Sequence, residues 1–259
     1  MKITAANYLG LVSLFVALAA LAVLFDTGVF ATSILLSIIP VAYLWLQLRP
    51  PTSLLSVIAV FAVGTTLLFE AVAASNGLWY SVPGNSWQLF GSVPAALFFS
   101  NFVFNVFVVM LYEYFLDDRS LHEPRANKHF RWLVFFAGAT TLIGLFASVS
   151  LSGTVSSYAF ATLLMLVVGT LGAVLWLSHS ASRQLLLKAA KAAGLIFPFF
   201  VIHEIVALFN VHIVYANPTQ YLYSISLLGN DWPLEKLFFF IIIPVWLVVV
   251  YEVYLDDGK

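Results

Sequence analysis

The chain has 259 residues, of which 62% are hydrophobic, 16% are aromatic and 9% are charged. Its formal net charge is −1, and it contains no cysteine. This composition excludes an ordinary water-soluble domain, and the missing thiols exclude disulfides, thiolate metal sites and cysteine nucleophiles.

Apolar runs long enough to cross about 30 Å of hydrocarbon recur along the chain. The breaks between them carry turn-forming residues, as in Asp26-Thr27-Gly28 and Arg49-Pro50-Pro51. The sequence therefore predicts an all-α polytopic membrane protein with about eight transmembrane helices, or seven if one break is an interfacial kink. We expect these helices near residues 8–25, 29–48, 52–75, 94–116, 131–150, 157–179, 184–209 and 232–255.

Basic residues are distributed unevenly among the predicted connections. Lys236 stands beside Glu235 at the start of the last apolar run. All other lysines and arginines lie at the N-terminus, in even-numbered connections or at the C-terminus. By the positive-inside rule, this pattern predicts a multi-pass cell-membrane protein whose N- and C-termini are both cytoplasmic.

The chain also repeats itself. Residues 94–118 align with residues 233–257 without a gap, and residues 70–76 align with residues 204–210, each beginning with Glu and ending with Asn. We therefore predict two tandem four-helix repeats in the same orientation, joined into one integrated membrane domain. The first comprises residues 1–118, a cytoplasmic linker covers 119–130, and the second comprises residues 131–259. Parallel repeats in membrane proteins often place a site between the halves.

Three carboxyls and one imidazole are predicted to lie at one depth near the outer membrane surface. Glu70 and Glu204 fall near the outer ends of the third and seventh predicted helices. Glu235 falls in the first turn of the eighth, after Pro233, which suits a first helical turn. His203 adjoins Glu204 but points about 100° away around a helix. Ionisable groups in a membrane are usually paired, protonated or functional, so this layout predicts an acid/base site.

Each candidate also has a structural interpretation. Glu70 and Glu204 would accept hydrogen bonds from the loops that follow them, and Glu235 would cap its own helix at the positive end of the dipole. His203 would be a hydrogen-bonded packing histidine. The sequence has no His-x-x-x-His spacing and no Gly-x-Gly-x-x-Gly turn, so we expect neither a metal nor a bound cofactor.

The segment Pro233-Leu234-Glu235, followed by Phe238-Phe239, Pro244 and Tyr251-Glu252, resembles the signature of the lycopene cyclase domain family. These are small membrane-embedded carotenoid cyclases of bacteria, archaea and fungi. The stretch Asn76-Gly77-Leu78-Trp79-Tyr80 is similar to the Gly-x-Trp-aromatic element ahead of a motif helix in that family. The chain departs from the pattern at Lys236, where a second glutamate is common, and at Ala95-Ala96, where an acid is often found.

The resemblance implies a cofactor-independent acid/base cyclisation of the ψ-end of lycopene or a related acyclic carotenoid. It implies Glu235 as the proton donor or its immediate partner, with Glu204 and Glu70 as base or second acid. The expected partners are a lipid-soluble carotenoid and membrane lipid, without nucleic acid; a homo-oligomer or an association with other carotenoid enzymes is left open. The substrate-contacting residues are expected to be Trp79, Trp232, His203, Asn76, Asn210 and Phe238.

Two other interpretations stand beside the cyclase. A carotenoid hydratase would begin with the same protonation but let water capture the cation, so the outcome depends on how dry the pocket is. A non-enzymatic carotenoid- or retinal-binding protein, or a small transporter, is the second alternative. Lys236 sits at a helix start rather than in the middle of a span, which argues against an opsin.

Overall fold

The computed structural model describes residues 5–48, 78–81, 88–89, 93–116, 171, 182–215 and 221–254. Within these residues the chain is mostly helical, and four helical stretches are long and apolar enough to cross a membrane. These stretches are Ala5–Leu24, Val29–Leu48, Phe98–Phe115 and Leu185–Phe209. They indicate a helical membrane protein, as the composition predicts. The helices expected near residues 52–75, 131–150 and 157–179 lie outside the described residues.

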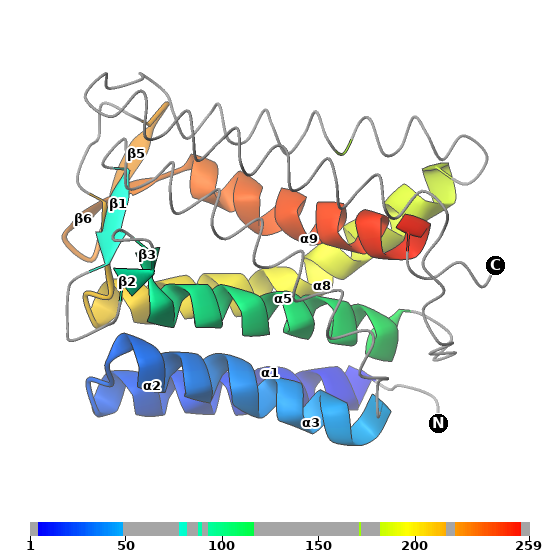
Figure 1. Cartoon of the computed structure of the whole chain (residues 1–259), viewed down its shortest axis with the longest axis horizontal. Helices are drawn as coiled ribbons and strands as arrows, with labels where there is room; N and C mark the ends of the chain where they lie inside the picture. Colours follow the sequence, from blue (N-terminus) through cyan, green and yellow to red (C-terminus); the bar gives the residue numbers. More distant parts are fainter. Residues whose placement is uncertain are drawn as a thin grey trace.

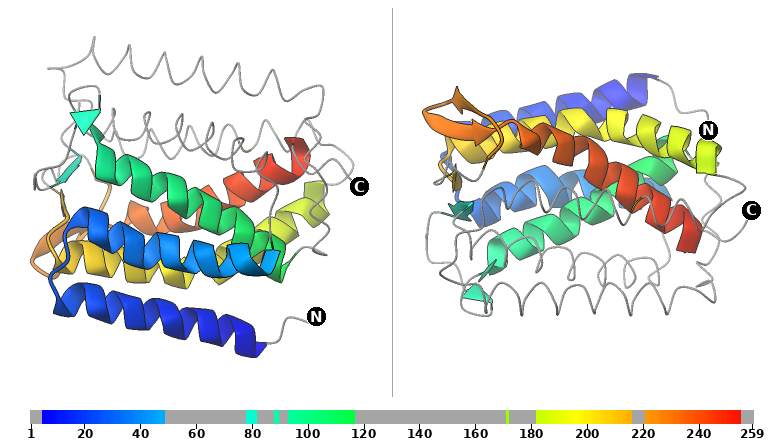
Figure 2. Two further views of the ribbon diagram at one scale, coloured as in Figure 1. Left: turned by 60° about the horizontal axis from the view of Figure 1, so that its bottom comes forward. Right: turned by 90° about the horizontal axis from the view of Figure 1, so that it is seen from above.

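The described helices run roughly along one common axis (Figures 1 and 2). The second predicted span is a continuous helical stretch of α2, a single π-helical segment η1 and α3. Both α5 and α9 begin at the same end of the bundle (Figure 1). The bounds are α1 Ala5–Leu24, α2 Val29–Ser33, η1 Ile34–Ile38, α3 Ile39–Leu48, α5 Ala95–Phe115, α8 Ser182–Phe209 and α9 Glu235–Tyr254.

Short antiparallel strand pairs gather at that end of the bundle, which we call the β end (Figure 1). The pair of β1 with β4 joins two connections that are far apart in the sequence. The pair of β5 with β6 is a hairpin whose two turn residues, Leu228 and Gly229, both have positive φ, as hairpin turns of this length favour. The strands are β1 Trp79–Ser81, β2 Gln88–Leu89, β3 Val93–Pro94, β4 Ile213–Tyr215, β5 Ser224–Leu227 and β6 Asn230–Pro233.

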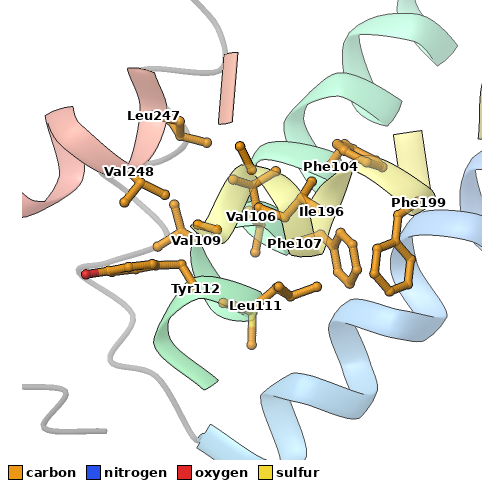
Figure 3. Close-up of a cluster of buried hydrophobic side chains, with 14 of the residues drawn as sticks. Phe104, Val106, Phe107, Val109, Leu111, Tyr112, Ile196, Phe199, Leu247 and Val248 are labelled. Atoms are coloured by element: carbon orange, nitrogen blue, oxygen red, sulfur yellow. The ribbon is translucent and has the colours of Figure 1, made fainter. Parts of the chain in front are cut away.

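The main apolar core lies between α1, α5, α8 and α9 (Figure 3). Phe107 of α5 meets Phe199 of α8 edge to face, with ring centroids 5.1 Å apart, and Phe15 of α1 meets Phe199 at 5.0 Å. Aromatic edge-to-face pairs stabilise a core beyond the area that they bury. Exposed apolar side chains such as Leu24 and Leu46 lie on the outside of the bundle, as expected of helices that face lipid.

The predicted boundaries of the first, second, fourth and seventh spans agree with α1, α2–α3, α5 and α8 to within a few residues. The last span also agrees to within a few residues, but the helical role predicted for Pro233 is wrong. Trp232 and Pro233 belong to strand β6, and α9 begins at Glu235. Pro233 therefore ends a strand instead of opening a helix, and this hairpin brings Trp232 back towards α8. Glu235 does lie in the first turn of its helix, as predicted.

Candidate functional site

Glu204 is a buried carboxyl near the end of α8, with 5% of its surface exposed. Its Oε1 atom accepts a hydrogen bond from the Tyr215 hydroxyl and another from Trp232 Nε1 at 3.0 Å. Tyr215 ends β4 and Trp232 lies in β6, so two strands deliver these donors to the helix. A buried carboxyl needs such partners, because a charged group without them is costly in an apolar interior.

Lys236, in the first turn of α9, is the third partner of Glu204. Its Nζ atom lies 3.6 Å from Glu204 Oε2 and donates a 2.8 Å hydrogen bond to the Tyr215 hydroxyl. The same Nζ atom lies 5.3 Å from the centroid of the Tyr215 ring. Because the side chain of Lys236 is largely buried, this ammonium and the carboxyl of Glu204 form an ion pair screened from water.

Glu235 lies next to Lys236 on the chain but faces a different neighbour. One of its oxygens, Oε1, accepts a hydrogen bond from the backbone N–H of Leu222. Its other oxygen, Oε2, is buried and has no hydrogen-bond partner within the described residues. Only 3% of the residue is exposed. Because Leu222 lies thirteen residues upstream of Glu235, this hydrogen bond joins the start of α9 to the segment before β5 and is not a cap within the helix.

A second apolar cluster, which we call the β-end cluster, contains Tyr215 and Trp232, the two residues that donate hydrogen bonds to Glu204. Several of its members are aromatic, and some bear the polar atoms already described. The rings of Trp232 and Phe240 are 6.4 Å apart, and those of Phe200 and Phe240 stack at 5.1 Å. The buried members are Leu78, Leu208, Tyr215, Tyr221, Trp232, Phe239 and Phe240. Aromatic faces near a carboxyl suit a transient cation, because the ring quadrupole attracts positive charge.

The loops at the β end hold this arrangement together. The Tyr221 hydroxyl donates to the carbonyl of Leu78, which links the connections that carry β1 and β5. The N–H of Leu234 donates to the carbonyl of Tyr223 at 2.9 Å. Both ends of the short segment 221–223 are thus held by hydrogen bonds. The N–H of Leu222 therefore reaches Glu235 from a fixed position.

The other predicted site residues are dispersed. His203 is half-buried, and its ring meets that of Phe104 of α5 with centroids 5.9 Å apart. Phe238 is 53% exposed on the outside of α9. Trp79 lies in β1, paired with Tyr215. Two further candidates, Glu70 and Asn76, lie outside the described residues.

Asn210 and His212 connect the end of α8 to the turn after α1. Asn210 Nδ2 donates to the carbonyls of Ala22 at 3.0 Å and Thr27 at 3.3 Å. His212 Nε2 donates to the carbonyl of Thr27 at 2.7 Å. Burial lowers the pKa of His212, whereas the bond to Thr27 and the charge of Asp26 raise it to a smaller extent. The observed partners of Asn210 are thus backbone carbonyls of the turn after α1, which is a structural role.

Two residues of the cluster escaped the sequence-based site prediction. Tyr215 resembles the interfacial aromatic residues that membrane proteins carry by default. Lys236 stands out in the sequence as the exceptional basic residue, which is the signal that could have identified it. Within the described residues, no three His, Asp or Glu side chains gather closely enough to hold a metal ion.

The comparisons with known proteins add no relative from which a function could be transferred. No family model matches the sequence, and neither the curated proteins nor the solved structures provide a match.

Proposed function

We propose that this membrane protein is an acid/base isomerase that cyclises the ψ-end of lycopene or a related acyclic carotenoid. The observation that carries the proposal is that two carboxyls lie at the β end: Glu204 accepts hydrogen bonds from two members of the β-end cluster, and Glu235 begins α9 beside Lys236. Both carboxyls are buried, yet their hydrogen-bond environments differ. Neighbouring carboxyls in different environments are the usual basis for assigning one acid and one base.

The reaction requires that one proton is added to the substrate and that one proton is later removed from it. Glu235 protonates the terminal double bond and produces a tertiary cation. The electrons of the neighbouring alkene then form the ring bond, which moves the positive charge into the new ring. A base removes one ring proton and restores a double bond, so the product has the same atoms as the substrate. Glu204 and Glu70 are the candidates for this base or for a second acid.

The surroundings of the carboxyls favour ring closure over capture by water. Trp232 donates to Glu204, and it is buried in one cluster with Phe239 and Phe240. A water-poor pocket protects a carbocation from hydration and leaves the alkene as its nearest nucleophile. A hydratase would require an ordered water at the same place.

Two tandem repeats in parallel orientation form part of this proposal. The alignment that matches Glu70 with Glu204 also matches Tyr80 with Val214, and these two residues pair with each other at the centre of the β1–β4 ladder. At the other end of the bundle, the matched Tyr112 and Tyr251 meet with ring centroids 6.3 Å apart. Contacts between matched positions at both ends support a two-fold axis along the helices, and hence an even number of spans with both termini on one side. The distribution of the basic residues makes that side cytoplasmic.

Expression in lycopene-accumulating bacteria tests the proposed reaction. Pigments would be separated and identified by mass and visible absorption. A product of unchanged mass with an altered chromophore is expected. A gain of one water would replace the cyclase with a hydratase, and unchanged lycopene in cells that contain the inserted protein would reject both reactions.

A further inference from the structure

We propose that Lys236 is a positioning residue that holds Glu204 as a carboxylate in the substrate-free protein and leaves Glu235 as the proton-bearing acid of the site. This inference rests on the proposed function for its catalytic meaning, but its structural content stands on the contacts of Glu204. It assigns a role to the residue at which the chain departs from the sequence pattern that it resembles.

The hydrogen bonds around Glu204 have a defined direction. An ammonium group has donors and no acceptor, so Lys236 must donate to the Tyr215 oxygen. The Tyr215 hydrogen is then directed at Glu204 Oε1. Trp232 Nε1 is also a donor without acceptor capacity, and it points to the same oxygen. Tyr215 therefore relays the orientation set by Lys236.

These partners favour one protonation state of Glu204. Two donors meet Oε1 and an ammonium faces Oε2, so a carboxylate satisfies every contact. A protonated Glu204 would find its acceptor in the Tyr215 hydroxyl oxygen, which already accepts from Lys236, whereas Trp232 Nε1 and the Lys236 ammonium can only donate. Hydrogen bonds to the charged form of a group stabilise that form.

Glu235 has the opposite surroundings. It has one donor, the N–H of Leu222, and its Oε2 atom is buried without a donor within the described residues. A second buried carboxylate here would add an uncompensated negative charge to a pair that Lys236 already neutralises. A neutral Glu235 avoids that cost. Its proton is therefore the one available to a substrate alkene.

Infrared spectroscopy of the purified, membrane-reconstituted protein tests this assignment without substrate, because protonated and ionised carboxyls absorb at separate frequencies. In the wild-type background, Glu235→Gln should remove absorption from the protonated-carboxyl region, whereas Glu204→Gln should remove none. Lys236→Met should add absorption there, and the double variant Lys236→Met/Glu204→Gln should lose that gain. Lys236→Arg keeps the charge and should match the wild type.

Two controls separate positioning from general damage. Lys191→Met removes a positive charge from an exposed site of α8 and should leave this spectral region unchanged. Circular dichroism checks that each variant retains its helix content. If Lys236→Met does not fold, the comparison of Glu204→Gln with Glu235→Gln in the wild-type background still decides the assignment.

Two results would overturn the inference. One is a loss of protonated-carboxyl absorption on Glu204→Gln alone, which would mean that Glu204 carries a proton. The other is a folded Lys236→Met variant with the wild-type spectrum, which would mean that Glu204 keeps its charge without the lysine. If the expected infrared pattern appears but cells accumulate unchanged lycopene, the proposed reaction fails and the charge assignment stands.

Discussion

The starts of α5 and α9 lie at positions that align in the sequence, but their side chains differ in chemistry. Each helix begins at the β end after a strand that closes with proline. Where α9 has Glu235 and Lys236, α5 has Ala96 and Leu97. Ala96 is also buried. A shared backbone frame can therefore carry a polar site in one half and an apolar contact in the other.

The far ends of the same helices are more alike. The Tyr112 hydroxyl of α5 donates to Glu252 of α9, and Lys188 of α8 lies 4.0 Å from the same carboxyl. Tyr-Glu stands at this position in both halves. The halves thus share the residues that join the helices at this end, whereas they differ at the β end. The two aligned segments therefore differ at the start of their helices, where α9 has two ionisable side chains and α5 has none.

The test with the largest expected effect concerns membrane topology, because a cysteine on one side of the membrane either reacts with an impermeant reagent or does not. Single cysteines at Ser86 and Thr219 should react with an impermeant thiol reagent from outside the cell, and those at Ser120 and Ser182 should not. The chain has no cysteine of its own, so the background is clean. Outside labelling at Ser86 with inside labelling at Thr219 would mean inverted halves and would remove the basis for matching α5 with α9.

The next largest expected effect is the loss of product formation when the carboxyls are substituted. Glu235→Gln should lower product formation by about 10²–10⁴-fold, the usual cost of losing a positioned general acid. Asp231→Asn, which makes the same chemical change at an exposed position of β6, is the matched control and should leave pigment yield unchanged. Near-wild-type yield from Glu235→Gln would reduce that carboxyl to a structural role at the start of α9.

The two matched glutamates provide a sharper test of asymmetry. Glu204→Gln should reduce pigment yield more than Glu70→Gln, because Glu204 shares its half of the chain with Glu235 and Lys236. Measurement requires only pigment extraction from cells with equal amounts of inserted protein. Equal and mild losses would indicate that both residues serve their loops.

The sequence predicts the described helices better than it predicts the contacts of the candidate site. Long apolar runs and matched polar positions identify α5 and α9 because helix length and periodicity are local properties. The contact of Lys236 with Glu204 depends instead on how α8 packs against α9. The contact of Trp232 depends on the β5–β6 hairpin, whose last strand leads directly into the apolar run of α9. Adjacent residues on a helix diverge by about 100°, so Glu235 and Lys236 reach different neighbours, which no linear motif reveals.

Breaking the ion pair should affect stability measurably. Lys236→Met or Glu204→Gln alone leaves one buried group without its partner, at a cost of about 3–5 kcal/mol in the free energy of unfolding. The double variant should recover part of that loss, because neither charge then needs compensation. Thermal unfolding of the reconstituted variants measures the coupling. If the losses of the two single variants simply add in the double variant, Lys236 and Glu204 do not interact. The difference between the starts of α5 and α9 would then have no effect on stability.

The smallest expected effect concerns His212, in the connection that pairs with the first half. Burial lowers its pKa in the folded protein below the unfolded value. The unfolded chain therefore binds the proton more readily, and folding is favoured when the residue is neutral. Its contribution should be fully present above the unfolded pKa of about 6.5 and should decline as pH falls from there towards the folded pKa. His212→Gln should remove this part of the pH dependence, measured as the difference between the thermal unfolding profiles of variant and wild type. Asn210 should keep its bonds to the turn after α1 in the variant as in the wild type, so the connection itself is preserved. Parallel unfolding profiles would mean that His212 has the same pKa in the folded and unfolded states.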